Sequence, residues 1–88
     1  MAKCFQFSVV TAEGTALEGA AEYCNLPTAG GSVGILADHA PMLCALNEGK
    51  VRCRMEDGTE RVFCVPSGVA EIRDNRVTIL SDRAEERT

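Results

Sequence analysis

Hydrophobic and polar residues alternate along much of this 88-residue chain. The clearest alternation lies in residues 50–55, with apolar side chains at Val51, Cys53 and Met55 and basic ones at Lys50, Arg52 and Arg54. Residues 5–11 show the same period, with Phe5, Phe7 and Val9 on one side. A period of two residues is typical of a β-strand with one face buried. The pattern therefore predicts strands that pack their apolar faces on a common core.

Runs of this kind recur between turn residues. We expect strands at 5–11, 16–19, 22–26, 33–36, 42–46, 50–55, 61–65, 69–73 and 76–80. Pro27 is expected to close the third strand, because proline cannot donate a ladder hydrogen bond. Asp57-Gly58 and Asp74-Asn75 are typical of hairpin turns. We expect the core to hold Phe5 or Phe7, Val9, Ile35, Leu43, Phe63, Ile72 and Ile79.

Strands this short and this closely spaced predict an all-β fold, an antiparallel β-sandwich of nine to ten strands. A chain of 88 residues accommodates one domain. We expect residues 1–82 to form this sandwich and residues 83–88 to form a short polar tail. The tail has helix-forming composition, but it is too short for a stable helix.

Charge, the length of apolar runs and the spacing of cysteines limit the classes of function that this chain can have. A net charge of −4 disfavours a nucleic-acid partner, which would need a clustered basic surface. No apolar run approaches the length of a membrane span, and the N-terminus lacks the apolar core of a signal peptide, so we expect a cytosolic chain. The five cysteines are widely spaced, which favours reduced, buried thiols over a disulfide framework or a metal site.

The segment from Gly30 to Pro41 concentrates glycines and contains the only histidine, His39. A phosphate-binding loop would lead into a helix, whereas a strand is expected here. A catalytic role for His39 would need a nucleophile, and Cys44 has no neighbouring cation to activate it, so we expect no catalytic residue. A structural role for His39 is to cap loop carbonyls. The basic residues of 50–55 are either a solvated strand face or a patch for an acidic partner.

Four segments are similar to those of a known family. They are Phe7–Glu13, Leu26–Thr28, Gly31–Leu46 with its Gly-x-Val-Gly-Ile-Leu-x-x-His-Ala-Pro pattern, and Ser67–Asp82. They are spread over nearly the whole chain, from residue 7 to residue 82. The sequence resembles the epsilon subunit of the F-type ATP synthase.

The resemblance implies a ten-stranded β-sandwich, which in the family is followed by a pair of C-terminal helices. It implies a non-catalytic subunit of the rotating central stalk, without a cofactor, which binds the gamma subunit and the c-ring and couples ion translocation to ATP synthesis. Its membrane association would be indirect, on the cytoplasmic side of the cell membrane. Because only eight residues follow Leu80, we expect the helices, inhibition of ATP hydrolysis and tight ATP binding to be absent. The alternative is a stand-alone β-sandwich protein-binding module.

The resemblance also assigns contact residues. For the gamma subunit they are Thr11, His39, Pro41, Met42 and Leu43. For the c-ring they are Thr28, Ala29, Gly30, Gly31 and Ser32. Relatives often carry glutamate where this chain has Gly30 and Ser32, and Asp38 is a candidate to replace that charge.

Overall fold

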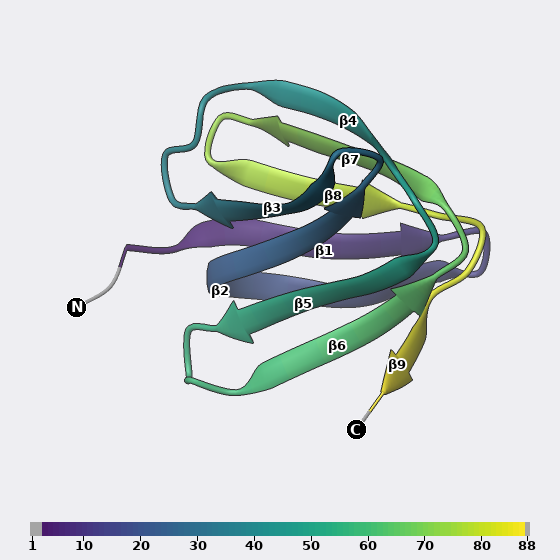
Figure 1. Cartoon of the computed structure of the whole chain (residues 1–88). Helices are drawn as coiled ribbons and strands as arrows, with labels where there is room; N and C mark the ends of the chain where they lie inside the picture. The colour runs from purple at the N-terminus through teal and green to yellow at the C-terminus, as the bar shows by residue number, and fades with distance from the viewer. Residues whose placement is uncertain (1–2, 88) are drawn as a thin grey trace.

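The computed structural model describes residues 3–87, which form nine strands and confirm the predicted all-β sandwich (Figure 1). The strands are β1 (Phe5–Thr11), β2 (Gly14–Thr28), β3 (Gly31–Leu36), β4 (Met42–Leu46), β5 (Gly49–Met55), β6 (Glu60–Val65), β7 (Gly68–Arg73), β8 (Arg76–Leu80) and β9 (Glu85–Arg87). Neighbouring strands pair antiparallel, except that β1 and β8 run parallel. No helix in residues 3–87 is long and apolar enough to cross a membrane.

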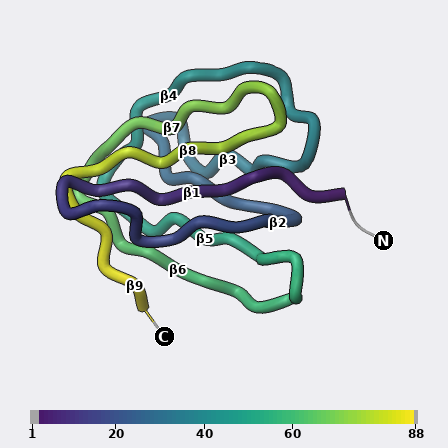
Figure 2. The backbone as a smooth tube through the Cα atoms, turned by 180° about the vertical axis from the view of Figure 1, so that it is seen from behind, coloured from purple at the N-terminus to yellow at the C-terminus, as the bar shows by residue number. Residues whose placement is uncertain are grey.

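The 15-residue strand β2 connects the two layers of the sandwich. Its first half pairs with β1, which continues through β8 and β7 to β4 and forms the first layer. Its second half pairs with β3 on one side and β5 on the other, and β5 continues to β6 and β9 in the second layer. Figures 1 and 2 show the two groups of strands from opposite sides. The inner faces of both layers enclose one core.

The predicted separation of residues 16–19 and 22–26 into two strands is wrong, because both belong to β2. The register passes from Ala21 opposite Met55 to Tyr23 opposite Arg54, so Glu22 is an extra residue, a β-bulge. The bulge moves the buried positions from odd to even numbers, from Ala21 to Cys24. This change of phase interrupts the alternation in the sequence. Nor does Pro27 close the strand, because Thr28 continues it.

The predicted hairpins are confirmed. Asp74 and Asn75 both have positive φ, 51° and 56°, as a two-residue type I′ turn requires between β7 and β8. In the β5–β6 turn Gly58 has a φ of 88°, and its backbone N–H donates to the oxygen of Met55 at 2.9 Å.

The predicted core is confirmed except at Leu43, which is 72% exposed. Both Phe5 and Phe7 are buried, with Val9, Ile35, Phe63, Ile72 and Ile79. In β4 it is Met42 and Cys44 that pack against the core, while Leu43 and Ala45 face outward. All five residues of β4 are apolar, so their sequence carries no alternation that could fix the phase.

Residues 85–87, despite their helix-forming composition, form strand β9 on the edge of β6. Glu86 lies opposite Phe63, and its carboxylate receives two hydrogen bonds from the Arg61 guanidinium, through Nε and, at 2.9 Å, through Nη2. The guanidinium also lies 6.0 Å from the centre of the Phe63 ring. A side-chain ion pair thus holds the short strand to the sheet.

Candidate interaction surfaces

The outer face of the first layer carries a row of apolar side chains. The register places Ala45 opposite Val69, Val69 opposite Leu80, and Leu80 beside Val10. Leu43 lies two residues before Ala45 on the same side of β4. Val69 and Leu80 are 38% and 47% exposed. We call the five residues Val10, Leu43, Ala45, Val69 and Leu80 the apolar face.

A hollow lies at each end of the apolar face. One is lined by Pro41, Met42, Leu43, Glu71, Ile72 and Arg73, and the other by Val10, Thr11, Ser67, Gly68, Leu80, Ser81 and Asp82. The residues predicted to contact gamma are therefore divided: Thr11 lies at one end of this face and Pro41 at the other. Leu43 is on the face itself, whereas Met42 points toward the core.

The loop between β3 and β4 is fixed by Asn75. The Asn75 side chain accepts a hydrogen bond from the backbone N–H of Asp38 at 2.8 Å and donates one to the oxygen of Cys4 at 3.0 Å. Asp38 has a φ of 62°, a conformation that favours glycine but is tolerated by aspartate. The Asp38 carboxylate also lies 3.5 Å from the Lys3 ammonium. The β7–β8 turn thereby positions the loop that contains His39.

His39 is half-buried, and its Nδ1 lies 2.8 Å from the backbone oxygen of Ala40. The ring thus contacts a loop carbonyl, as in the capping role considered for it. It extends from the same loop as Pro41, next to the hollow at that end of the apolar face. Its contact with gamma stays a prediction.

The five residues predicted to contact the c-ring stay together, in the turn between β2 and β3. The Thr28 hydroxyl donates to the Gly31 oxygen at 2.6 Å, and Gly31 has a φ of 111°. Residues 29–32 are all exposed, and the turn leads directly into β3 rather than into a helix. Thr28 lies opposite Leu46, which places the turn at the Thr11 end of the sandwich.

Asp38 lies at the other end of the six-residue strand β3, roughly 20 Å from this turn at the usual rise of an extended chain. Asp38 is therefore too far from this turn to replace the charge of the glutamates that relatives carry there, and that expectation is wrong. No acidic side chain lies within residues 28–32 of this turn.

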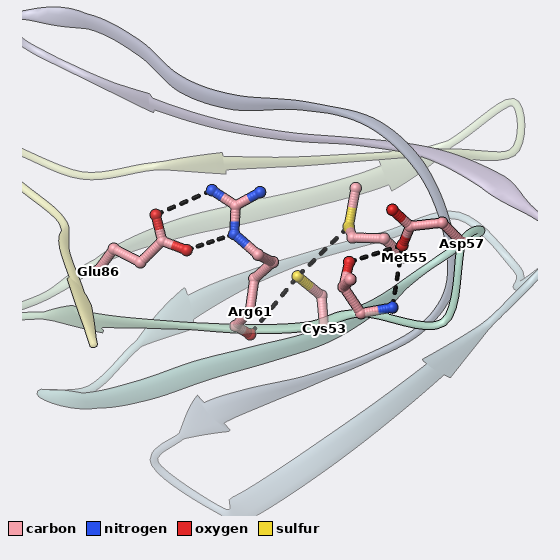
Figure 3. A network of polar contacts seen from close by, with 6 residues as sticks. Cys53, Met55, Asp57, Arg61 and Glu86 are labelled. Atoms are coloured by element: carbon pink, nitrogen blue, oxygen red, sulfur yellow. Dashed lines mark hydrogen bonds and ion pairs between the residues drawn. The ribbon is translucent and has the colours of Figure 1, made fainter. Parts of the chain in front are cut away.

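Burial makes Cys24, Cys44 and Cys53 poor candidates for reactive thiols. Burial raises the pKa of Cys24 to about 12 and that of Cys53 to about 11, and it also raises the pKa of Cys44. Cys53 Sγ lies 3.6 Å from the Arg61 oxygen and 3.7 Å from Met55 Sδ, two alternative acceptors for its single hydrogen, beside the Arg61–Glu86 ion pair (Figure 3). A thiol is a poor nucleophile when its thiolate is disfavoured. Residues 3–87 contain no cluster of three side chains that could hold a metal ion.

Four of the five residues of the apolar face were not predicted from the sequence: Val10, Ala45, Val69 and Leu80. The sequence does contain a signal for two of them. Val77 and Ile79 are the buried positions of β8, so Leu80 is an apolar residue at an outward position. Val69 is likewise apolar at an outward position of β7, which it shares with Glu71 and Arg73. An apolar residue on the polar phase of a strand is a candidate for an exposed contact surface.

Comparison with known proteins identifies the family. Residues 4–87 match the sequence model of the family described as "ATP synthase, Delta/Epsilon chain, beta-sandwich domain". The ATP synthase epsilon chain of Desulfitobacterium hafniense is 39% identical over 85 residues, which are 97% of this chain and 64% of that protein. That of Roseiflexus sp. (strain RS-1) is 43% identical over 77 residues, 88% of this chain and 55% of that protein. This chain thus spans less than two thirds of the length of these relatives.

Solved structures share the fold. A chain in the cryo-EM structure of the Euglena gracilis mitochondrial ATP synthase, OSCP/F1/c-ring, superimposes with a TM-score of 0.89 at 20% identity, over 94% of this chain and 53% of that one. A chain of the Tetrahymena thermophila mitochondrial ATP synthase central stalk/c-ring structure superimposes with a TM-score of 0.79 at 16% identity, over 94% of this chain and 66% of that one. With the match over residues 4–87, the conclusion is that this chain belongs to the family of ATP synthase delta/epsilon chain β-sandwich domains.

Proposed function

We propose that this chain acts as the epsilon-type subunit in the rotor of an F-type ATP synthase, where it binds the gamma subunit and the c-ring. In this role it performs no catalysis itself and couples ion translocation to ATP synthesis by linking the two partners. Family membership supports the proposal, as do relatives named ATP synthase epsilon chain. The observation that carries it is the apolar face, an exposed row of apolar side chains on an otherwise ordinary sheet.

The apolar face is the proposed site for gamma. Protein interfaces bury an apolar centre inside a polar rim, and here Leu43, Val69 and Leu80 form the centre. Thr11 at one end, and His39 with Pro41 at the other, supply the rim. Met42 contributes only through the hollow that it lines.

The turn at residues 28–32 is the proposed site for the c-ring. It lies at one end of the sandwich, whereas the apolar face lies on the side of a layer, so both partners fit at once. Because this turn lacks acidic side chains, backbone groups and shape supply the contact in place of charge pairs. Through the c-ring the subunit would lie at the cytoplasmic side of the membrane without entering it.

The test measures binding of the purified chain to a gamma subunit by titration calorimetry. Leu43→Glu and Leu80→Glu each place a charge within the proposed contact and should weaken binding by about 30-fold or more, the range of a hot-spot residue. Leu36→Glu is the matched control, since Leu36 is a leucine with 62% exposure on the other layer, and it should change affinity less than about twofold. Unchanged affinity in the Leu43→Glu, Leu80→Glu double variant would exclude this face as the gamma site.

A further inference from the structure

The outer face of the second layer carries positive charge. In β5, Lys50, Arg52 and Arg54 point outward because Val51, Cys53 and Met55 are buried. Arg52 lies opposite Val62 of β6, and Val62 lies opposite Arg87 of β9, so the outward row extends across these strands. Side chains directly opposite each other on paired strands share one face. The outward side chains of β5, β6 and β9 therefore include four cations, against the two carboxylates of Glu60 and Glu85.

These cations are only partly neutralised. Arg54 lies 3.6 Å from the carboxylate of Glu60, but within residues 3–87 neither Lys50 nor Arg52 forms an ion pair. Residues two apart on a strand are about 7 Å apart, so the like charges of Lys50, Arg52 and Arg54 repel one another. The whole chain carries a net charge of −4. A cationic strip on an acidic protein is thus a local feature of this face.

An aromatic ring lies next to the strip in a fixed position. Tyr23 is opposite Arg54 on one side and opposite Leu36 on the other. Its ring lies over Gly34, where an added Cβ would come within 3.2 Å of the ring and of its hydroxyl. The hydroxyl accepts a hydrogen bond from Asn25 Nδ2 at 3.2 Å. Tyr23 and Leu36 are 37% and 62% exposed, and together they form a small apolar surface beside the cations.

We propose that this surface, the basic face of Tyr23, Leu36, Lys50, Arg52 and Arg54, binds an extended acidic segment of a partner protein. An apolar side chain of the segment packs on Tyr23 and Leu36, and its carboxylates pair with Arg52 and Lys50. Exposed tyrosine and arginine side chains are the residues on which interface energy most often concentrates.

The net charge of the whole molecule favours an acidic protein segment over a nucleic acid or an anionic membrane. A nucleic acid or an anionic membrane presents many phosphates over a wide area, and the net charge of −4 repels such a surface. A short acidic segment contacts only the cationic strip and so avoids most of this repulsion. Beyond Lys50 the face continues into a hollow of about 320 Å³ that is lined by the cations Lys50, Arg83 and Arg87 and also by the carboxylates of Glu48 and Glu85. The basic face lies on the layer opposite the apolar face, so this proposal does not depend on the proposed function.

The probe is a fluorescein-labelled peptide of about ten residues in which glutamate alternates with leucine and serine, an extended acidic segment with apolar anchors. Fluorescence anisotropy measures its binding to the full chain at low salt. Lys50→Glu with Arg52→Glu should reduce affinity at least tenfold. Tyr23→Ala should reduce it severalfold, whereas Tyr23→Phe, which keeps the ring, should retain it. Chemical-shift changes in the amide spectrum should map to β2, β3 and β5, the strands that carry the basic face.

The matched control is Arg73→Glu with Arg76→Glu, the same change of charge at two exposed, paired residues of the first layer. This double variant should bind the peptide within about twofold of the parent chain. Equal losses in the two double variants would reduce the effect to net charge and overturn the proposal. So would the absence of saturable peptide binding, or tighter binding to a single-stranded oligonucleotide or to phosphatidylglycerol vesicles. A folded amide spectrum for each variant excludes loss of the fold as the cause.

Discussion

Gly68 begins β7, directly after the bend at Pro66 and Ser67, and its φ is 156°. A Cβ at this position would lie 2.3 Å from the backbone oxygen of Leu80 and 3.3 Å from the Cβ of Ser81. Both contacts are with β8 or the residue after it, and the oxygen cannot move without disturbing the strand. Close approach of two backbones is therefore what requires glycine here.

We expect Gly68→Ala to reduce the free energy of unfolding by about 2 kcal/mol or more, because the added methyl overpacks a backbone contact. Gly30→Ala is the matched control. Gly30 has no atom within 4 Å of an added Cβ and no positive φ, so its change should stay within about 0.5 kcal/mol. Urea denaturation monitored by circular dichroism measures both. Equal midpoints for the two variants would contradict this account of Gly68.

Asn75 shows what a sequence can and cannot predict about one residue. Asp74-Asn75 between two alternating runs predicted a hairpin turn, and both residues adopt the positive φ that such a turn needs. The hydrogen bonds from the Asn75 side chain to Asp38 and Cys4 join segments distant in sequence. Local chemistry contains no information on which distant segments meet, so these contacts had to come from the structure.

At the scale of elements, the buried and exposed sides of a strand were predictable where apolar and polar residues alternate clearly and were not predictable where they do not. β5 alternates throughout, and its buried and exposed sides are those expected. β4 is apolar at every position, so its phase is set by pairing with β7, where Leu43 meets Glu71 on the outer side. In β2 the bulge at Glu22 changes the phase within one strand. Both errors arise where neighbours, rather than the strand's own sequence, decide which way a side chain faces.

Strand β9 is the shortest strand in residues 3–87. Its three residues are all exposed, and besides backbone pairing with β6 it has two side-chain contacts with that strand, the ion pair of Glu86 with Arg61 and a hydrogen bond from Arg87 Nε to Cys64 Sγ at 3.4 Å. The hydrogen bonds from Arg61 lower the pKa of the Glu86 carboxyl below its ordinary value of 4.5. A lowered pKa means that the carboxylate stabilises the docked strand at pH values above 4.5. This contribution is lost as the pH falls through the lowered pKa.

We therefore expect β9 to loosen in acid while the rest of the sandwich persists, because the pair is partly exposed and contributes little to global stability. Heteronuclear NOE values for the amides of residues 85–87, recorded from neutral pH downward, measure this. Glu86→Gln should loosen β9 at neutral pH and remove its pH dependence. Asp57→Asn, at another carboxyl with a lowered pKa, should leave β9 unaffected. A β9 that stays ordered in Glu86→Gln would show that the ion pair is not its anchor.

At the scale of the whole molecule, the two layers give this chain two outward faces with different chemistry. The first presents the apolar face and the second presents the basic face, with one continuous core between them. The family resemblance predicted contact residues for gamma at Thr11 and in the loop around Pro41. It did not show that they mark the two ends of one apolar row, because that depends on the register of β4, β7, β8 and β1. The basic strip was visible in the sequence, but its aromatic neighbour Tyr23 lies on another strand.

Since the two faces share no residue and lie on opposite layers, we expect gamma and the acidic peptide to bind at the same time. Packed cores transmit little change when a partner docks rigidly, so each ligand should alter the other's affinity by less than about twofold. The measurement is peptide anisotropy with and without saturating gamma. Leu80→Glu should weaken gamma binding alone, and the Lys50→Glu, Arg52→Glu double variant should weaken peptide binding alone. Displacement of the peptide by gamma would show that the two partners use one face, and at least one of the two assignments would then be wrong.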